Sequence, residues 1–499
     1  MSVRAAAALP APPAHAGSPK GKASGATRAG EIALWVTVGL AILGTLAATR
    51  RGMPPFLVLG LFVVPLVFIA FQSTLLSWQT MLGAILVVIL FIPIRRYTVA
   101  GSGPVELEPY RVLIALVLGL WFLALAADPK VRWRRTGYGV PILLLWLGII
   151  GSIAMNLGKV NAMSDAVLKQ VTFFASYFLV LCFVASVVRP GNQLDRIMKV
   201  LVFGGAIVAA CALYEWRSGV NLFNGLGRFL PFLQYQDIGD AMLRGTGARA
   251  LASAQHPIAL GAALVMLIPL SVYLFKRNGS KIWLLCGGLL TLGALATGSR
   301  TAMLMLMVVF GTFVWLKRAE MLRMAPVWLV LLVLVQGVMP GTLQSFKYML
   351  NPAFMIQEQS QEMGTGSGRI ADLGPSLAEW RSGNPFFGAG FGTRVTSQDG
   401  VEGAQILDNQ WLGTLLTIGA VGAVGLMWLF IRAIRRLARK ARSATGADSW
   451  LATSLAASTL AWTLGLFTYD AFAFIQVTFL AFVILGFAVV AAQGDEQTT

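Results

Sequence analysis

Long apolar runs separated by short polar connectors follow one another along most of this chain. A bilayer-spanning α-helix needs about 17 to 25 predominantly apolar residues. The alternating polarity of membrane β-barrel strands, in segments of about 10 residues, does not appear. The pattern predicts an all-α polytopic membrane protein with about 12 to 14 transmembrane helices. The candidate windows lie near residues 31–49, 54–71, 75–94, 109–127, 140–156, 170–188, 198–216, 257–275, 281–297, 300–316, 325–340, 409–430, 450–468 and 470–490.

One long polar interval, residues 341–408, interrupts this pattern. Within it, Ile370, Leu373, Leu377 and Trp380 recur at spacings of three and four, which predicts a short amphipathic helix. The GAGFG run at 388–392 permits tight turns and a close approach of the backbone to a ligand. The regular placing of Arg, Trp and paired Gly favours a structured site over a disordered linker.

Composition and charge indicate a membrane protein and predict on which side of the membrane its loops lie. Of 499 residues, 57% are hydrophobic and 12% are charged, with a mean hydropathy of +0.73; a soluble domain carries about twice that charged fraction. The formal charge of +18 does not indicate a nucleic-acid partner, because the basic residues cluster in short loops that the positive-inside rule makes cytoplasmic. These loops are 130–135, 189–199, 276–281, 317–323 and 432–442.

The 341–408 interval holds four basic and seven acidic residues, so it is predicted to be extracytoplasmic. The pairs Arg50–Arg51 and Arg95–Arg96 fall on the wrong side of the membrane if all fourteen spans are real. The N-terminal third of the topology is therefore the part that the charge pattern defines least.

Four regions follow from these observations. Residues 1–30 are rich in Ala, Pro, Gly and Ser and predict a disordered basic cytoplasmic tail. An N-terminal transmembrane scaffold occupies 31–197, a core with its extracytoplasmic loop 341–408 occupies 198–440, and the last transmembrane helices and tail occupy 441–499. The three cysteines lie in spans at no metal-ligand spacing, and the chain has only two histidines, so neither a metal site nor a cofactor is expected.

Three arginines stand out from the core. Arg300 lies in GSR between two apolar runs with almost no loop, where an anionic partner would offset its cost in the membrane. That partner is either a ligand or a carboxylate of the chain, unless the side chain caps exposed carbonyls. Arg249 precedes a helix expected to begin at Pro257, and Arg369 opens the amphipathic helix. Glu215, by contrast, is interpreted as a plain interfacial charge.

The polar interval closes with Asp408, Asn409 and Gln410, directly before a long apolar helix. N-capping of that helix by Asp408 and a chemical role for Asp408 both remain open. The helix carries glycines that most simply allow close packing against neighbouring helices: Gly413, Gly419, Gly422 and Gly425.

Taken in order, four segments resemble the O-antigen polymerase and ligase superfamily of bacterial envelope polysaccharide assembly over roughly residues 200–440. They are Arg249 ahead of His256–Pro257, GSR at 298–300, SGR…W…NPFFGAGFG at 367–392, and DNQWLGTLLTIGAVG at 408–422. The resemblance implies metal-independent glycosyl transfer on the outer face of the bacterial inner membrane. The donor would be a polyprenyl-diphosphate-linked glycan held in the membrane lipid, and the acceptor a sugar hydroxyl.

Residue roles follow from the resemblance and from the chemistry of each side chain. A departing diphosphate needs positive charge, for which Arg249, Arg300 and Arg369 are the candidates. The acceptor hydroxyl must lose a proton, and Asp408 is the candidate base or acceptor-orienting residue. Predicted substrate-binding residues are Asn409 and Gln410 on sugar hydroxyls, His256, which is also a second candidate base, Trp380 and Arg394.

Ligases of the superfamily carry a His where this chain has Asp408–Asn409, which fits the polymerase branch. A polymerase joining lipid-linked repeat units into O-antigen, capsule or exopolysaccharide is therefore the first hypothesis, and a ligase transferring finished glycan is the second. A chain-length regulator is a further candidate partner of a polymerase. A transporter or flippase is disfavoured because mid-span charges and an internal repeat are not evident. A purely structural scaffold would not explain why Arg300 lies between two apolar runs.

Overall fold

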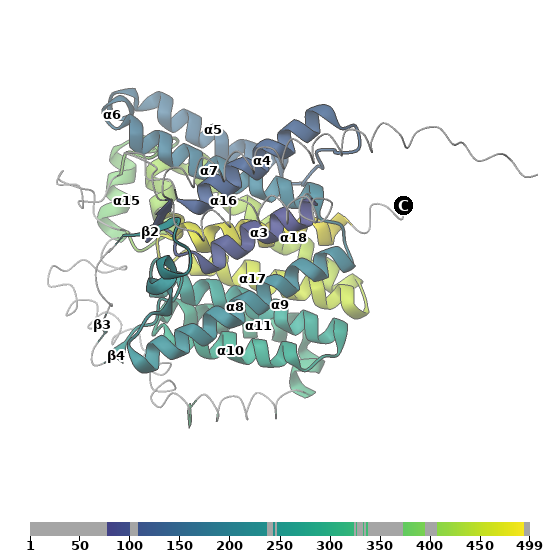
Figure 1. The fold of residues 1–499 in the computed structure, drawn as a ribbon. Coiled ribbons are helices and arrows are strands. Elements are labelled where there is room, and N and C mark those ends of the chain that lie inside the picture. Colours follow the sequence, from purple (N-terminus) through teal and green to yellow (C-terminus); the bar gives the residue numbers. More distant parts are fainter. Residues whose placement is uncertain are drawn as a thin grey trace, which may run out of the picture. The chain divides into compact units, whose positions relative to one another are not determined.

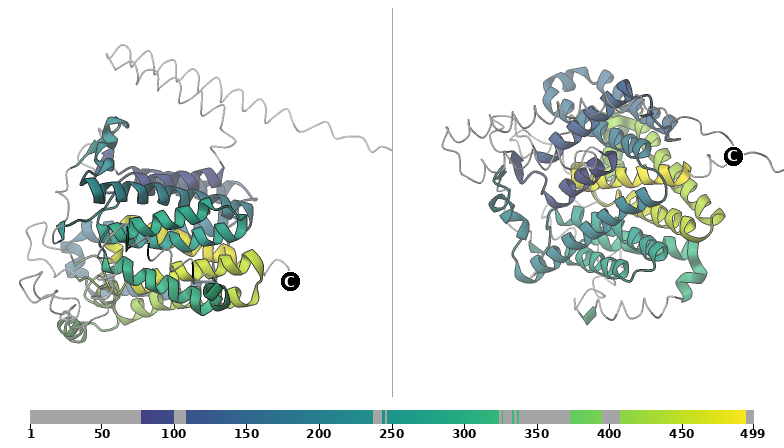
Figure 2. Two further views of the ribbon diagram at one scale, coloured as in Figure 1. Left: turned by 90° about the horizontal axis from the view of Figure 1, so that it is seen from below. Right: turned by 45° about the vertical axis from the view of Figure 1, so that its right-hand side comes forward.

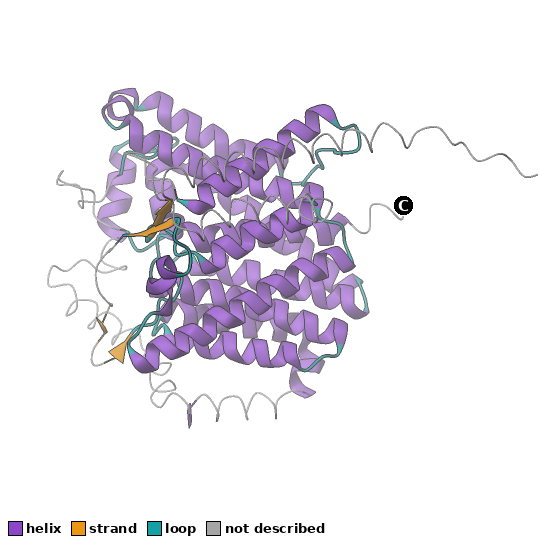
Figure 3. Ribbon diagram, in the orientation of Figure 1, coloured by secondary structure: helices purple, strands orange, loops and turns teal. Residues whose placement is uncertain are grey.

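The computed structural model describes residues 77–99, 108–236, 243–244, 247–323, 326, 333, 336–337, 373–394 and 407–493. The chain divides into two units, Met1–Thr80 and Met81–Thr499. Nearly all of the described residues belong to the second unit, and the account below concerns that unit. Its described part is almost entirely helical, with short strands in the loops (Figure 3).

Helices follow one another along the chain as the apolar windows predict (Figure 1). They are α3 (Trp78–Phe91), α4 (Pro109–Ala127), α5 (Gly139–Met155), α6 (Leu157–Ala162), α7 (Ser164–Val187), α8 (Asn192–Ser218), α9 (Pro257–Asn278), α10 (Ile282–Ala296), α11 (Arg300–Arg323), α15 (Leu373–Ser382), α16 (Gln410–Ser443), α17 (Gly446–Gly465) and α18 (Ile475–Gln493).

Shorter elements lie in the connections. The 3-10 helices are η1 (Leu222–Arg228) and η3 (Ala471–Ala473). Strand β1 (Tyr97–Val99) pairs antiparallel with β2 (Leu233–Tyr235), with Tyr97 opposite Tyr235. Strand β3 (Leu243–Arg244) pairs in the same way with β4 (Gly247–Ala248).

The prediction of an all-α polytopic membrane protein is confirmed. Among the described residues, seven helices are long and apolar enough to cross a membrane: α4, α7, α8, α9, α11, α16 and α18. The helices α3, α5 and α10 are apolar but shorter. The tail at 1–30 and the windows near 31–49 and 54–71 lie outside the described residues, as does most of 325–340, so the total of 12 to 14 spans stays a prediction.

Small side chains let the helices of the second unit pack closely. Helix α9 packs against α8, α10, α11, α17 and α18, and α17 also packs against α16 (Figure 2). A Cβ atom added to Gly425 would collide with the backbone of Leu145 and Pro141 in α5. The backbone of Gly422 lies so close to Gly148 of α5 that a Cβ on Gly148 would collide with it. The predicted packing role of these two glycines is therefore confirmed. Gly413 has no atom near its absent Cβ, so the packing prediction is wrong there.

The basic loops predicted to share one side of the membrane do gather at one end of the helices, which we call the basic end. Polar contacts join these loops and the adjoining helix ends there: Arg436 Nη1 to Thr136 O at 3.3 Å, Arg277 Nε to Asp195 Oδ2 at 3.3 Å, Lys276 Nζ to Glu320 Oε2 at 3.4 Å, and Lys317 Nζ to Ser449 Oγ at 2.6 Å. The opposite end holds the α8–α9 loop, the α10–α11 turn, the start of α16 and the α17–α18 turn. We call it the site end.

Candidate functional site

Two of the predicted arginines meet at the α10–α11 turn. Arg249 lies in the loop before α9, and its Nε atom donates a hydrogen bond to the carbonyl oxygen of Thr297 at 3.1 Å. The next residue repeats the attachment, because Ala250 N donates to Ala296 O at 3.2 Å. The loop is thus fixed against the turn whose last residues lead into Arg300.

Arg300 is the first residue of α11, where the helix macrodipole adds positive potential. Ser299 opens the helix, and its carbonyl accepts from Met303 N at 3.2 Å. Thr468 Oγ1, from the α17–α18 turn, donates to Thr301 Oγ1 at 2.9 Å. The α10–α11 turn is therefore held between the loop that carries Arg249 and the α17–α18 turn.

His256 is the N-cap of α9, and its Nδ1 accepts a hydrogen bond from Ile258 N at 3.1 Å. Its ring lies 5.4 Å from that of Phe474, centroid to centroid. Burial, reinforced by the charge of nearby Arg249, lowers the pKa of His256 to about 4. The imidazole is neutral at pH 7, and the occupied Nδ1 leaves Nε2 to carry the proton. His256 is accordingly better suited to donate a hydrogen bond to a substrate than to act as a base.

Asn409, and not Asp408, caps α16: its Oδ1 accepts from Leu412 N at 3.1 Å. The capping explanation for Asp408 is therefore wrong. Gln410 is buried, with Oε1 accepting from Phe472 N at 2.8 Å and its backbone N donating to Leu466 O at 2.8 Å. These bonds attach the α17–α18 turn to the start of α16, so the side chain predicted to hold a sugar has a structural partner instead.

Asp470 is a site residue that the sequence reasoning missed. It lies in the α17–α18 turn that Gln410 holds, near enough to Asp408 for the two carboxyl charges to interact. Burial, with a further contribution from Asp408, raises the pKa of Asp470 to about 6, while the Ala473 N–H and Arg95 oppose the rise. The predicted topology could have identified Asp470, because counting the spans places the α17–α18 turn at the same end of the helices as Asp408.

Glu215, expected as a plain interfacial charge, is buried at the end of α8 and that expectation is wrong. Its carboxylate accepts from Leu251 N and Ala252 N, at 3.2 and 2.7 Å. Arg96, predicted on the wrong side of the membrane, is likewise buried at the site end and donates to Ala252 O at 3.2 Å. The Arg95–Arg96 pair thus belongs to the site end, which explains its conflict with the charge count.

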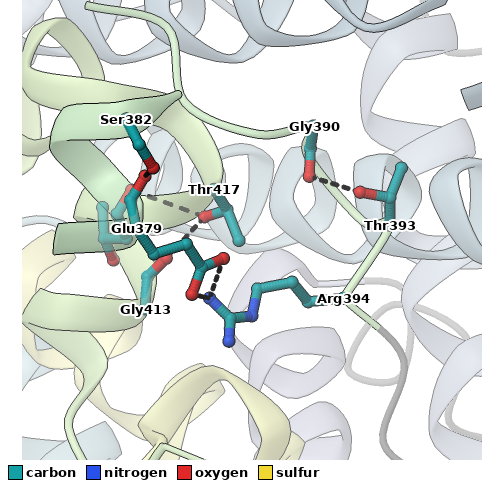
Figure 4. A network of polar contacts seen from close by, with 8 residues as sticks. Glu379, Ser382, Gly390, Thr393, Arg394, Gly413 and Thr417 are labelled. Atoms are coloured by element: carbon teal, nitrogen blue, oxygen red, sulfur yellow. Dashed lines mark hydrogen bonds and ion pairs between the residues drawn. The ribbon is translucent and has the colours of Figure 1, made fainter. Parts of the chain in front are cut away.

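Two side chains of the polar interval that were predicted to bind substrate make contacts within that interval instead. Trp380, in α15, donates from Nε1 to Pro385 O at 2.9 Å. Arg394 pairs with Glu379 through Nη1, 3.2 Å from Oε1, and Figure 4 shows this pair beside the Thr393–Gly390 bond. Both residues therefore hold the loop together. Arg369 lies outside the described residues, so its place in the clamp stays a prediction.

Residues 385–389 fill a break in α16. At Gly419 the helix is interrupted, with φ 68° and ψ −172°. Ala420 N donates to Pro385 O at 2.9 Å, and Ala389 N donates to Leu416 O at 2.8 Å. The loop backbone thereby satisfies groups that the break would leave unpaired in an apolar surrounding. Gly388, with φ 73°, makes the turn that was predicted, but its close approach is to the carbonyl of Leu416.

No group of three or more His, Cys, Asp or Glu side chains that could hold a metal ion occurs in the part of the chain that the structure describes. The candidate residues at the site end are instead Arg249 and Arg300 beside the α10–α11 turn, the neutral imidazole of His256, and the carboxyl groups of Asp408 and Asp470. Such a set can bind a polyanion, donate to hydroxyl groups and accept a proton.

The fold defines a polytopic helical membrane protein, and its candidate site residues lie at one end of the helices. Within that class, residues 285–427 match the family model described as O-antigen ligase. This match supports placing the chain in the O-antigen polymerase and ligase superfamily, as its motifs predict. The matched range includes Arg300 and Asp408, whereas Arg249, His256 and Asp470 lie outside it. No curated protein matches the chain.

Proposed function

We propose that this protein is a membrane glycosyltransferase that polymerises polyprenyl-diphosphate-linked oligosaccharide repeat units. The observation that carries the proposal is the bond from Arg249 to Thr297, which brings the first arginine to the turn that leads into Arg300. Two guanidinium groups, one from the loop before α9 and one from the start of α11, suit a diphosphate, because each can donate a planar pair of hydrogen bonds and stays charged. Arg369 is proposed as a third member of the clamp.

In the proposed reaction an acceptor hydroxyl oxygen attacks the anomeric carbon of the donor sugar. The bond from that carbon to the phosphate oxygen breaks, and its electron pair leaves with the lipid diphosphate. Arg249 and Arg300 stabilise the negative charge that develops on this leaving group, which is where preorganised charge has its largest effect. The hydroxyl proton passes to Asp408.

Asp470 supports the proton transfer. Two carboxyl groups close together favour the uptake of one proton by the pair. Asp470, whose pKa is raised to about 6, is proposed to modulate the charge beside Asp408 as it takes up and releases a proton. His256, neutral and with Nε2 as donor, is proposed to hydrogen-bond a sugar or phosphate oxygen.

The site is proposed to face the periplasm or the cell exterior of a bacterial inner membrane, since the basic loops lie at the opposite end. No metal is required, because arginine supplies the charge. Ligation of finished glycan to another acceptor remains the second candidate, and the family match favours neither over the other. The Asp408–Asn409 pair, in place of a His, favours the polymerase.

The test is reconstitution of the purified protein in lipid with a polyprenyl-diphosphate oligosaccharide. A polymerase yields a ladder of multiples of the repeat together with free polyprenyl diphosphate. Single transfer that appears only when a different acceptor is added would establish the ligase instead. Movement of intact donor across the bilayer without new glycosidic bonds would overturn both.

A further inference from the structure

Six residues, Ala250 to Gln255, separate Arg249 from His256. Four of them, Leu251 to Ala254, form a turn that is buried from Ala252 onward and is held from two sides. On one side the Glu215 carboxylate accepts from the backbone N–H groups of Leu251 and Ala252. On the other, Arg96 donates from Nη1 to Ala252 O at 3.2 Å and from Nη2 to Ala254 O at 2.9 Å. Each of these bonds joins a backbone group of the turn to a charged side chain from a distant part of the sequence.

The turn is strained as well as buried. Ala252 has φ 41°, a left-handed value that residues other than glycine adopt at a cost. It is 1% exposed, and a strained residue persists only where its surroundings over-determine it. Here a carboxylate and a guanidinium fix its N–H and its C=O at the same time. Charged partners make these the strong kind of hydrogen bond.

The same two side chains reach other segments of the site end. Arg96 also contacts Asn224 Oδ1 at 3.2 Å. Glu215 Oε1 accepts from Asn221 Nδ2 at 3.0 Å, and that same amide donates to Ala252 O at 3.0 Å. The turn is thus tied to α8, to η1 and to the segment before β1, which are far apart in the sequence.

We propose that Arg96 and Glu215 are a positioning pair: they hold the 251–254 turn so that Arg249 and His256, at its two ends, point at the same substrate. Within the turn the pair contacts backbone atoms only, and it takes no part in the reaction itself. This inference rests on the proposed function, since it concerns the geometry of the diphosphate clamp. It assigns a purpose to two charges that would otherwise be costly to bury.

A merely structural role would give a different response to mutation. A residue that only stabilises the fold lowers the amount or stability of the protein, and its effect adds to that of Arg249→Ala. A residue that acts through Arg249 loses its effect on diphosphate binding once Arg249 is absent, because coupled residues are not additive. The experiment therefore compares Arg96→Lys and Glu215→Gln, each alone and combined with Arg249→Ala.

The probe is radiolabelled undecaprenyl diphosphate, bound to purified protein in lipid nanodiscs. Each single variant is expected to weaken binding and to lower kcat/KM for the lipid-linked donor by about 10- to 100-fold, the size of loss that a small misplacement produces. Hydrogen exchange of a peptide covering residues 249–256 is expected to be faster. In the Arg249→Ala background, Arg96→Lys is expected to weaken diphosphate binding by less than a further twofold.

Arg277→Lys is the matched control, because Arg277 pairs with the buried carboxylate of Asp195 at the basic end. It should leave diphosphate binding and exchange of residues 249–256 unchanged. If Arg96→Lys or Glu215→Gln does not accumulate, Asn221→Ala takes its place, since Asn221 contacts both Glu215 and Ala252.

The outcomes separate the two proposals. A wild-type protein that neither binds the probe nor transfers glycan overturns the proposed function and the positioning role with it. A wild-type protein that does both, with pair variants that bind normally or add their loss fully to that of Arg249→Ala, overturns the positioning role alone. Weaker binding without faster exchange of residues 249–256 would also overturn it.

Discussion

The side chain of Arg249 is bonded to the backbone of Thr297, three residues before Arg300, through an Nε-to-carbonyl hydrogen bond of 3.1 Å. This bond fixes the guanidinium group of Arg249 against the backbone of the α10–α11 turn. The arginine is thus aimed by a fixed turn and not carried on a free loop. Preorganisation of this kind is what makes charge effective in catalysis.

Arg249→Ala and Arg300→Ala are each expected to lower glycan transfer by about 10²- to 10³-fold, the loss typical of removing one stabiliser of a developing anion. Lysine at either position keeps the charge but loses the two-pronged contact, and should recover only part of the rate. Rates are measured per mole of folded protein in lipid. Arg277→Ala, at the basic end, is the control for the loss of a paired arginine. Full activity in both Arg249→Ala and Arg300→Ala would contradict the proposed diphosphate clamp.

The carboxyl pair predicts a pH dependence of the reaction. Because the pKa of Asp470 is raised to about 6, Asp470 takes up a proton as the pH drops through about 6 and its negative charge beside Asp408 is lost. Transfer by the wild-type protein should therefore fall over this pH range. The pKa of His256 is about 4, so its protonation cannot cause this fall. His256→Gln should keep the midpoint near pH 6, whereas Asp470→Asn should shift it. A midpoint that moves in His256→Gln alone would reverse the assignment.

Asp470 also predicts a change in stability with a defined sign. Its pKa is raised from 3.8 to about 6 in the folded protein, so folding favours its protonated form. The stabilising contribution is therefore complete below pH 3.8 and is lost as the pH rises through about 6. At pH 8 the ionised carboxylate destabilises the fold, and Asp470→Asn should raise Tm by a few degrees. The difference should vanish below pH 4. A lower Tm for the variant at pH 8 would contradict the raised pKa of the Asp470 carboxyl group.

Most of the described helices could be predicted from the sequence, because a transmembrane helix depends on one continuous apolar segment. Each apolar window inside the described residues coincides with a helix, since burial in hydrocarbon depends on length and composition. The site motifs were recognisable for a related reason: Arg300 and Asp408 interrupt apolar runs, where polar residues are conspicuous. Arg249 and His256 were found through their place before a helix-starting proline.

Contacts between segments that are far apart in the sequence could not be predicted in this way. Glu215 binds the backbone 36 residues away, and Arg96 binds it 156 residues away, so nothing near either residue indicates its partner. Gln410 appeared available for a sugar because the turn that it holds lies some 60 residues further along the chain. Asp470 was missed since its interaction with Asp408 exists only after α16, α17 and α18 have packed.

Chelation provides a test of the proposed metal independence. Arginine is expected to supply the positive charge on the diphosphate, so glycan transfer by the purified protein should keep its full rate after exhaustive treatment with EDTA. The control is the untreated protein assayed in the same lipid and buffer. Loss of activity that added Mg²⁺ or Mn²⁺ restores would show that a metal ion performs part of the role given to Arg249 and Arg300.

Gly419 gives the sharpest prediction on stability. Its φ of 68° is unfavourable for a side chain, and a Cβ there would collide with the backbone of Phe386 and Phe387. Gly419→Ala should therefore destabilise the protein by at least about 2 kcal/mol, from backbone strain and overpacking together. Gly413→Ala, in the same helix and with nothing within 4 Å of its Cβ, is the matched control. Thermal unfolding in one detergent compares them, and equal Tm values would mean that residues 385–389 do not occupy the break in α16.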